Sequence, residues 1–180
     1  GMGEKSILEI ANALKNGDDI TKIKGIAYIT KELDTISDYE EIASYEEVKE
    51  NKLSYAKATL TQFQNQDPIG SKTLIQKHND RYLVVNPPQM PLGEKELDHV
   101  YSLSYTYTYH PMYEDKGIPA LNEVKFSITH NRGCFGECNF CALTFHQGRK
   151  VTSRSVDSVV KEAEKMTSFK DFKGYIHDIG

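Results

Sequence analysis

The sequence predicts an α/β fold built from two parts. In the N-terminal part, an apolar helical period over Ser6–Asn16 is followed by a short apolar segment at Lys24–Ile29. A helix, a loop and a parallel strand in this order would form the end of a Rossmann-like sheet. In the C-terminal part, Glu123–Thr129 alternates polar and apolar residues, and Phe172–Gly180 is a second strand beyond an amphipathic helix. This order of strand, helix and strand predicts one βαβ unit.

The composition argues against several classes of protein. Hydrophobic residues make up 38% of the 180 residues and charged residues 27%, which is typical of a soluble globular protein. The net charge of −4 gives no overall basic surface for nucleic acid or an anionic membrane. The apolar runs are too short to span a bilayer, and no signal peptide opens the chain. We therefore expect a cytoplasmic protein, in a reducing compartment that suits free thiols.

The first helix is predicted over Ser6–Asn16. Its apolar residues form one stripe, and Gly17 follows at a position where glycine commonly ends a helix. The stripe consists of Ile7, Leu8, Ile10, Ala11 and Leu14.

An acidic linker and a long helix are predicted next. Lys31–Ile42 has no clear period and is interpreted as a linker. The capping box Ser44-Tyr45-Glu46-Glu47 opens a helix that we expect to continue to about Gln64, before Asp67-Pro68. Its predicted inward residues are Val48, Leu53, Ala56, Leu60 and Phe63.

Two strands joined by a tight turn are predicted over Thr73–Gln76 and Arg81–Val85, because turn-forming residues separate two apolar runs. A short helix is predicted over Leu92–Tyr101. The two histidines of this region, His78 and His99, are interpreted as surface or interface residues rather than ligands.

Five tyrosines fall within the segment Tyr101–Tyr113. In an extended segment, Tyr105, Tyr107 and Tyr109 would lie on one face. That face could line a substrate entrance or a radical relay, or it could pack a linker against the neighbouring domain.

The C-terminal βαβ unit has a clear apolar pattern. Val124, Phe126 and Ile128 share one face of the predicted first strand. Ser155 is predicted to cap the following helix. The inward residues of this helix are expected to be Val156, Val159, Val160, Ala163 and Met166.

All three cysteines of the chain lie within Asn131–Arg149. Cys134, Cys138 and Cys141 have the spacing C-x3-C-x2-C. An odd number of thiols in one short loop argues against a disulfide framework. The neighbouring glycines and charged residues argue against burial in a core. The pattern therefore indicates metal or cluster ligation.

The possible metal centres differ in the ligands that they need. A structural zinc site needs four ligands, and the fourth would have to be His130 or His146. An ordinary 4Fe–4S electron carrier uses four cysteines. Three thiolates would instead bind three irons of a cluster and leave the fourth iron open to another ligand.

The cysteine segment resembles the signature of radical S-adenosylmethionine (SAM) proteins, in which an aromatic residue, here Phe140, precedes the last cysteine. The surrounding segments resemble the YgiQ family of uncharacterised radical SAM proteins. These segments are SITHNRGCFGECNFCALTFHQGRKVTSRS (127–155), YLVVNPPQMPLGEKELDHVY (82–101), HP-x-Y-x4-IPALNEVKFSIT (110–129) and the closing DFKGYIHDIG. One departure is visible: relatives are expected to carry a proline and an arginine before His110, where this chain has SLSYTYTY.

The resemblance implies a radical SAM enzyme. Cys134, Cys138 and Cys141 would bind three irons of a 4Fe–4S cluster, and SAM would chelate the fourth. Reductive cleavage of SAM would give a 5′-deoxyadenosyl radical that acts on a substrate the sequence does not identify. Phe140 would stack beside the adenine of SAM, and Gly180 would be the first member of a glycine pair that contacts its amino group.

The resemblance also implies a domain organisation. Residues 1–30 would end a Rossmann-like N-terminal domain, residues 31–122 would form the linker, connecting helix and hairpin, and residues 123–180 would begin a partial (β/α)6 radical SAM barrel. Because GMGE is internal in this family, and DIG should continue into a second glycine, we expect the chain to be part of a longer protein. Its first residues resemble the end of a cobalamin-binding-type domain, but no cobalamin-ligating histidine motif is present.

The expected partners are a substrate and a one-electron donor such as flavodoxin or ferredoxin. Four basic residues around the cysteines would ease reduction of an anionic cluster and attract an acidic donor, unless they simply form a solvated edge. They are Arg132, Arg149, Lys150 and Arg154.

Other residues of the loop have predicted supporting roles. Gly133 and Gly136 are expected to permit backbone conformations that let the loop turn around a cluster. His146 and Gln147 are expected to donate hydrogen bonds to cluster sulfurs.

Overall fold

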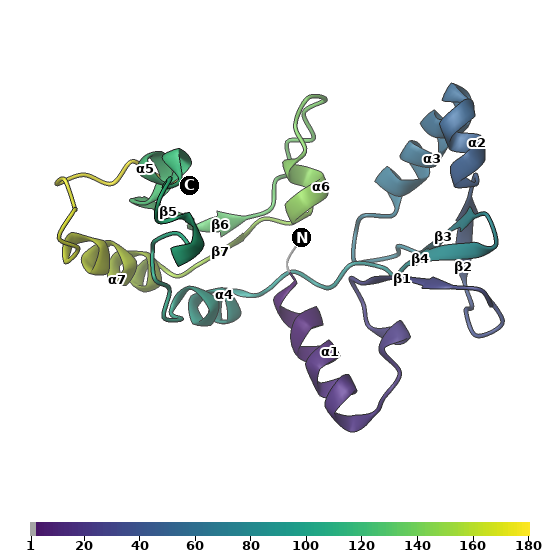
Figure 1. The fold of residues 1–180 in the computed structure, drawn as a ribbon, viewed down its shortest axis with the longest axis horizontal. Helices are drawn as coiled ribbons and strands as arrows, with labels where there is room; N and C mark the ends of the chain where they lie inside the picture. Colours follow the sequence, from purple (N-terminus) through teal and green to yellow (C-terminus); the bar gives the residue numbers. More distant parts are fainter. Residues whose placement is uncertain (1–2) are drawn as a thin grey trace. The chain divides into compact units, whose positions relative to one another are not determined.

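The structure is a computed structural model that describes residues 3–180. The chain forms two compact units, each with its own helices and strands (Figure 1). The first unit comprises the N-terminal residues up to Pro91 together with Cys134–Arg149, and the second comprises Leu92–Gly133 together with Lys150–Gly180. Both units mix helices with short strands, in agreement with the predicted α/β class.

A four-stranded mixed sheet lies at the centre of the first unit. The strand order is β1-β4-β3-β2, with β1 and β3 antiparallel to β4 and β2 parallel to β3. The strands are β1 (Ala27–Thr30), β2 (Tyr39–Ile42), β3 (Thr73–His78) and β4 (Arg81–Val85). Ile75 and Val84 are paired across β3 and β4 and are fully buried, so they form the best-packed part of the sheet.

The β3–β4 hairpin confirms the prediction from sequence. Asn79 and Asp80 lie between the strands, and Asn79 has a φ of +52°. Asparagine tolerates this left-handed conformation better than most residues, which is why the turn can be tight.

Two predictions about the other strands were wrong. The strand after the first helix was expected to be parallel to its neighbour, but β1 pairs antiparallel with β4. Tyr39–Ile42 was assigned to a linker, but it is strand β2, which pairs with β3. In both cases the pairing partner lies far along the chain, so the local period does not reveal it. The wider assignment of residues 1–30 to a Rossmann-like domain stays a prediction.

The helices of the first unit are α1 (Glu4–Asn16), the 3-10 helix η1 (Ile20–Lys22), α2 (Tyr45–Glu50), α3 (Lys52–Gln64) and α6 (Leu143–Gln147). Helix α1 ends as predicted, at Gly17 with a φ of +74°. Its buried residues are Ser6, whose hydroxyl donates to the Lys24 carbonyl at 2.8 Å, and Ala13. The apolar stripe is therefore not the buried face, since its largest members are exposed: Ile7, Leu8 and Leu14.

The predicted long helix is two helices. Ser44 caps α2 as expected, because its hydroxyl accepts a hydrogen bond from the Glu47 N–H. Asn51 then ends α2 and begins α3, accepting from the N–H groups of Leu53 and Ser54 at 2.9 and 3.2 Å. An asparagine that caps in this way competes with a continuous helix. The break rotates the inward face of α3, so that Leu53 and Leu60 are exposed and Ala58 is buried.

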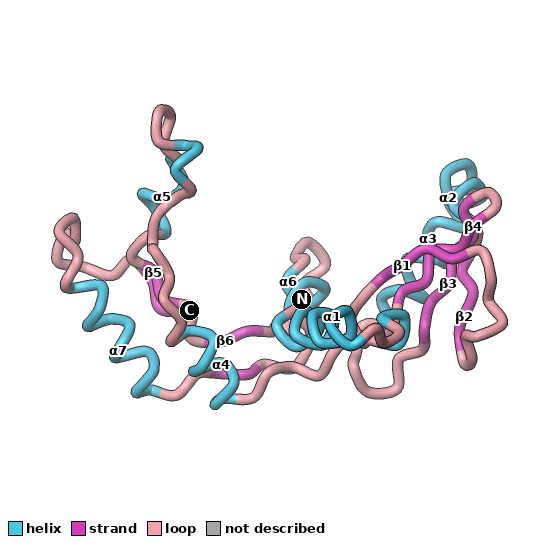
Figure 2. Tube along the Cα trace, turned by 60° about the horizontal axis from the view of Figure 1, so that its bottom comes forward, coloured by secondary structure: helices cyan, strands magenta, loops and turns pink. Residues whose placement is uncertain are grey.

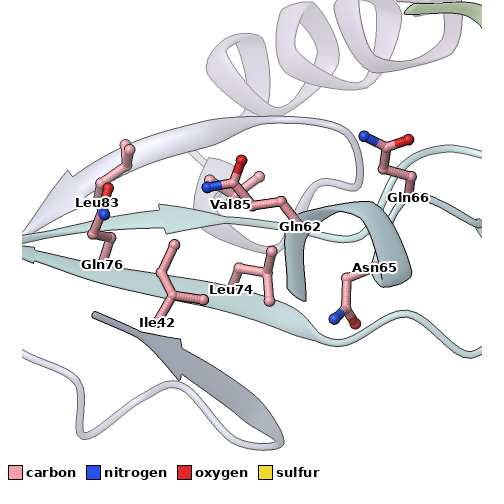
Figure 3. A pocket seen from close by; sticks show the side chains of 8 residues that line it. All are labelled: Ile42, Gln62, Asn65, Gln66, Leu74, Gln76, Leu83 and Val85. Carbon is pink, nitrogen blue, oxygen red and sulfur yellow. The ribbon is translucent and has the colours of Figure 1, made fainter. Parts of the chain in front are cut away.

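A cavity of about 330 Å³ lies where the end of α3 meets the sheet (Figure 3). Its sheet side is largely aliphatic, from Ile42, Leu74, Leu83 and Val85, and side-chain amides come from Gln62, Asn65, Gln66 and Gln76. It contains no cysteine and no charged side chain, so it is separate from the cysteine loop described below.

The second unit is built on a short parallel pair of strands. Its elements are α4 (Glu94–Tyr101), η2 (Pro111–Tyr113), α5 (Pro119–Val124), β5 (Ser127–Ile128), β6 (Asn131–Arg132), β7 (Thr152–Ser153), α7 (Val156–Thr167) and β8 (Asp178–Ile179). Strand β5 is parallel to β8, and α7 lies between them in the chain, so a βαβ connection is present. Figure 2 shows β6 and β7 side by side, as an antiparallel ribbon that the chain forms between β5 and α7.

The core of the second unit contains Phe126, Ile128 and Met166. Val159 and Ala163 of α7 pack against it as predicted, whereas Val156 and Val160 are exposed at 78% and 48%. The strands are shorter than predicted from sequence. Val124 ends helix α5 instead of starting a strand, because Pro119 occupies the first helical position, where its fixed φ favours a helix.

The tyrosine segment does not present one extended face. Tyr107 has a φ of +53°, which interrupts the alternation expected for Tyr105, Tyr107 and Tyr109. The Tyr107 ring packs on Phe169 at a centroid distance of 5.3 Å, and the Tyr105 side chain is 48% exposed. This arrangement favours the packing role for Tyr107.

No helix within residues 3–180 is long and apolar enough to cross a membrane.

Candidate cluster-binding loop

The chain forms a long loop, which includes the short helix α6, between β6 and β7 (Figure 1). All three cysteines lie in this loop. The base of this loop is closed by the Cys134 N–H, which donates to the Gly148 carbonyl at 2.9 Å. Thr144 of α6 is buried, and its hydroxyl donates to the Cys134 carbonyl at 3.1 Å. These two hydrogen bonds fix the backbone at the first cysteine. The role of Thr144 was not predicted, since a threonine ten residues away carries no motif.

Gly133 is required at the entrance to the loop. Its φ is +93°, and a β-carbon there would lie 2.1 Å from the Lys150 carbonyl oxygen. Gly133 therefore has the left-handed conformation that was predicted for it. Gly136 does not have a positive φ, so that part of the prediction was wrong. A β-carbon at Gly136 would lie 3.4 and 3.6 Å from the sulfurs of Cys134 and Cys138, which is ordinary van der Waals contact.

Substitution of Gly133 by alanine is expected to open the base of the loop. The added methyl group collides with backbone, so the cost should exceed the ~1 kcal/mol typical of alanine at a left-handed glycine position. Gly148→Ala is the matched control, since Gly148 has a φ of +87° but nothing within 4 Å of the added carbon. Urea unfolding of both variants checks the prediction, and equal losses of stability for the two would contradict it.

The thiols of the loop are free and accessible. Cys134 and Cys141 are half-buried and Cys138 is exposed. The sulfurs of Cys134 and Cys138 both lie close to Gly136, whose N–H donates to the Cys134 sulfur at 3.4 Å. A turn brings the third cysteine back, because the Cys141 N–H donates to the Cys138 carbonyl at 2.9 Å.

This arrangement can be compared with the needs of the possible metal centres. Among residues 3–180, no three His, Cys, Asp or Glu side chains are gathered closely enough to hold one metal ion. A zinc site needs its ligands to converge on a single ion. A 4Fe–4S cluster presents a separate iron to each cysteine, so the thiolates need only surround it. The loop offers three free thiols for such a cluster.

Two phenylalanines of the loop are strongly exposed. Phe140 is 93% exposed and Phe135 is 82% exposed, in a chain whose other aromatic rings are mostly covered in part. The stacking of Phe140 on the adenine of SAM stays a prediction. Phe135 was not singled out, although it directly follows Cys134.

Gly180 follows β8 and is held by backbone hydrogen bonds beside β5. Its N–H donates to the Ile128 carbonyl and its carbonyl accepts from the His130 N–H, each at 3.0 Å. His146 is exposed on α6, and Gln147 ends that helix.

The four basic residues do not form a uniform exposed edge. Arg154 is buried, Arg149 forms an ion pair with Glu137, and Arg132 packs on the Tyr101 ring at 5.2 Å. Lys150 is exposed. The interpretation that all four supply free positive charge was therefore wrong for Arg154 and Arg149, because their charges are used internally.

Arg154 organises the βαβ connection of the second unit. Its guanidinium pairs with Glu162 and donates to the Thr129 carbonyl at 3.0 Å and to the Ser158 carbonyl at 3.0 Å. Its planar face lies 4.2 Å from the centroid of the Tyr101 ring. These contacts link α7 to the backbone directly after β5.

Tyr107 completes this network, since its hydroxyl donates to a Glu162 carboxylate oxygen at 3.0 Å. Burial, followed by the neighbouring negative charge of Glu162, raises the pKa of Tyr107 to about 12. At the N-terminus of α7, Asp98 accepts from the Ser155 N–H at 2.9 Å, and hydrogen bonding to Ser155 lowers the pKa of this carboxyl.

One unit contains a βαβ connection and the other a loop of three free cysteines, two features expected of the radical SAM class of proteins. The chain belongs to the radical SAM N-terminal family, whose pattern matches residues 1–127. This match confirms the resemblance inferred from the sequence.

Curated relatives agree with this family. The chain is 58% identical to a UPF0313 protein of Clostridium botulinum (strain ATCC 19397 / Type A) over 184 aligned residues, which cover 100% of this chain and 28% of the relative. It is 54% identical to a UPF0313 protein of Clostridium perfringens (strain ATCC 13124), with 100% of this chain and 28% of the relative covered. The chain thus spans less than a third of the length of these relatives. No solved structure shows significant similarity to it.

Proposed function

We propose that this chain is part of a radical SAM enzyme in which Cys134, Cys138 and Cys141 hold a 4Fe–4S cluster. The observation that carries the proposal is the loop itself, which has three free thiols, two of them close to Gly136, on a backbone closed at its base. Membership of the radical SAM N-terminal family supports it. When bound, the cluster would supply the electron that cleaves SAM to methionine and a 5′-deoxyadenosyl radical, which takes a hydrogen atom from the substrate.

The residues of the chain would position the cluster ligands and bind SAM. Thr144 and Gly148 hold the backbone of Cys134, so that its sulfur keeps one orientation. Phe140 is exposed enough to stack on the adenine of SAM. Gly180 keeps one lone pair of its carbonyl oxygen for the amino group of SAM, because His130 uses the other.

The C-terminal βαβ connection would begin a partial (β/α)6 barrel. The parallel pairing of β5 with β8, and the position of the cysteine segment after β5, support this assignment. Barrel enzymes place their chemistry on loops that follow the strands, which is where the three cysteines occur.

The remaining parts of the proposal concern the cellular compartment, the electron donor and the substrate. Exposed thiols that must stay reduced suit the cytoplasm. A one-electron donor such as flavodoxin or ferredoxin would reduce the cluster. The substrate is not identified by any residue of the loop.

The test uses a protein of the full length of the curated relatives. It would be reconstituted anaerobically with iron and sulfide, reduced, and examined by electron paramagnetic resonance with and without SAM. We expect a 4Fe–4S signal that shifts when SAM is added. A cluster signal that does not change when SAM is added would instead indicate an electron carrier. A colourless protein with one tightly bound zinc would overturn the enzyme proposal.

A further inference from the structure

Arg149, at the end of the cysteine loop, makes three kinds of contact with one guanidinium group. It forms an ion pair with Glu137 through its Nε. Its Nη2 donates to the Phe63 carbonyl at 3.2 Å. Its Cζ lies 4.5 Å from the centroid of the Phe63 ring. The Arg149 side chain is only 24% exposed, so these contacts remove most of the guanidinium from water.

Arginine can make all three contacts at once, whereas lysine has no planar, forked group with which to do so. A planar guanidinium can stack on an aromatic face while its edge donates hydrogen bonds in the plane. Phe63 lies in the last turn of α3, where the helix leaves its carbonyl groups without internal partners. Arg149 satisfies one of these carbonyls, and its positive charge is favourable at this end of the helix. Phe145 of α6 also packs on Phe63, at a centroid distance of 5.3 Å.

The partner of the ion pair lies between two of the cysteines. Glu137 directly precedes Cys138 and has a φ of +46°, a conformation that is unfavourable for a residue with a β-carbon. Such a conformation persists only when surrounding contacts hold it. The ion pair with Arg149 is such a contact, and it links the middle of the loop to its end.

We propose that Arg149 is a positioning residue for the cysteine loop. It holds Glu137, and through it the backbone between Cys134 and Cys138, against the end of α3. The contacts of Arg149 with α3 hold the loop independently of the β6–β7 ribbon, because α3 and the loop belong to the same compact unit. The role of Arg149 in ligation rests on the proposed function, whereas its role in ordering the loop does not.

Four variants of the full-length protein test the proposal: Arg149→Gln, Arg149→Lys, Glu137→Gln and Lys150→Gln. Lys150→Gln is the matched control, since Lys150 is the residue after Arg149 and its positively charged side chain is exposed. Arg149→Lys keeps the charge but loses the stacked, forked geometry. Glu137→Gln removes the negative charge of the ion pair. The Glu137 side chain is 44% exposed, so this variant should fold even if Arg149→Gln does not.

The first measurement is hydrogen exchange of residues 134–149 in the metal-free protein. We expect faster exchange at the Cys134 and Cys141 amides in Arg149→Gln and Glu137→Gln, and unchanged exchange in Lys150→Gln. Unchanged exchange in both of the first two variants would overturn the proposal, whether or not the protein binds a cluster.

The second measurement follows the reconstituted protein. We expect Arg149→Gln to release iron to a chelator about 10-fold faster than the wild type, as is typical when residues that orient metal ligands are lost. Lys150→Gln should stay within about twofold of the wild type. The SAM concentration that half-shifts the resonance signal should rise in Arg149→Gln, and Arg149→Lys should recover only part of either effect.

The outcomes separate the two proposals. A wild-type protein that takes up no cluster would overturn the proposed function, while the exchange measurement would still decide the role of Arg149. A wild type that binds cluster and SAM, with Arg149→Gln indistinguishable from Lys150→Gln, would overturn only the positioning role. The double variant Glu137→Gln/Arg149→Gln should lose little more than either single variant, because both remove one interaction.

Discussion

Replacement of Cys138 by alanine is expected to abolish the cluster and the response to SAM. The chain has only three cysteines, all in one loop, and the proposed cluster uses every one of them. A variant with two thiolates would leave two irons without protein ligands, so iron should fall from about four atoms per chain to a small residue. Because the Cys138 side chain is exposed, folding should change by less than about 0.5 kcal/mol.

The control for this variant is His146→Ala, which also tests the alternative metal site. His146 is exposed on α6 and would be a ligand only if the loop held zinc. We expect iron to be retained in His146→Ala and lost in Cys138→Ala, since the predicted hydrogen bond from His146 to a cluster sulfur would not hold an iron by itself. Loss of metal in both variants would point to a site that uses histidine, and retention of the cluster in Cys138→Ala would contradict the ligand assignment.

The parts of the fold that could be predicted from sequence are those whose signals are local. The β3–β4 hairpin has its turn residues between its own strands, Ser44 and Ser155 cap the helices that follow them, and Gly17 ends α1. Each feature depends on a few neighbouring residues. The cysteine loop belongs to the same group, because its C-x3-C-x2-C spacing is complete within one segment.

The parts that could not be predicted depend on distant partners. Strand β2 is defined by its pairing with β3, which lies beyond two helices in the chain. The contact between Arg149 and Phe63 joins residues that are 86 positions apart. A basic residue near a cysteine motif suggested free positive charge, and only the packing shows that Arg149 and Arg154 are occupied. The break at Asn51 is different: its capping signal was local, but the apolar period on both sides outweighed it.

Replacement of Arg154 by methionine is expected to cause the largest loss of stability in the second unit. The Arg154 side chain is 1% exposed and that of Glu162 is 10% exposed. Removal of one partner from a buried ion pair typically costs about 3–5 kcal/mol, because the other charge is left without compensation. The Thr129 and Ser158 carbonyls would lose donors as well. Tyr107 could still donate to Glu162, but a single hydroxyl does not neutralise a carboxylate.

The measurement is hydrogen exchange of the amides of α7 in the full-length protein, which reports the free energy of local opening. Arg154→Met should lower that free energy by the amount given above, and Lys161→Met, at an exposed position of the same helix, should not. The double variant Arg154→Met/Glu162→Leu should regain much of the loss, since a buried pair replaced on both sides leaves no isolated charge. A double variant less stable than Arg154→Met would mean that Arg154 acts mainly through Tyr101 and the two carbonyls. If Arg154→Met left the free energy of opening of α7 unchanged, the βαβ connection would not depend on this arginine.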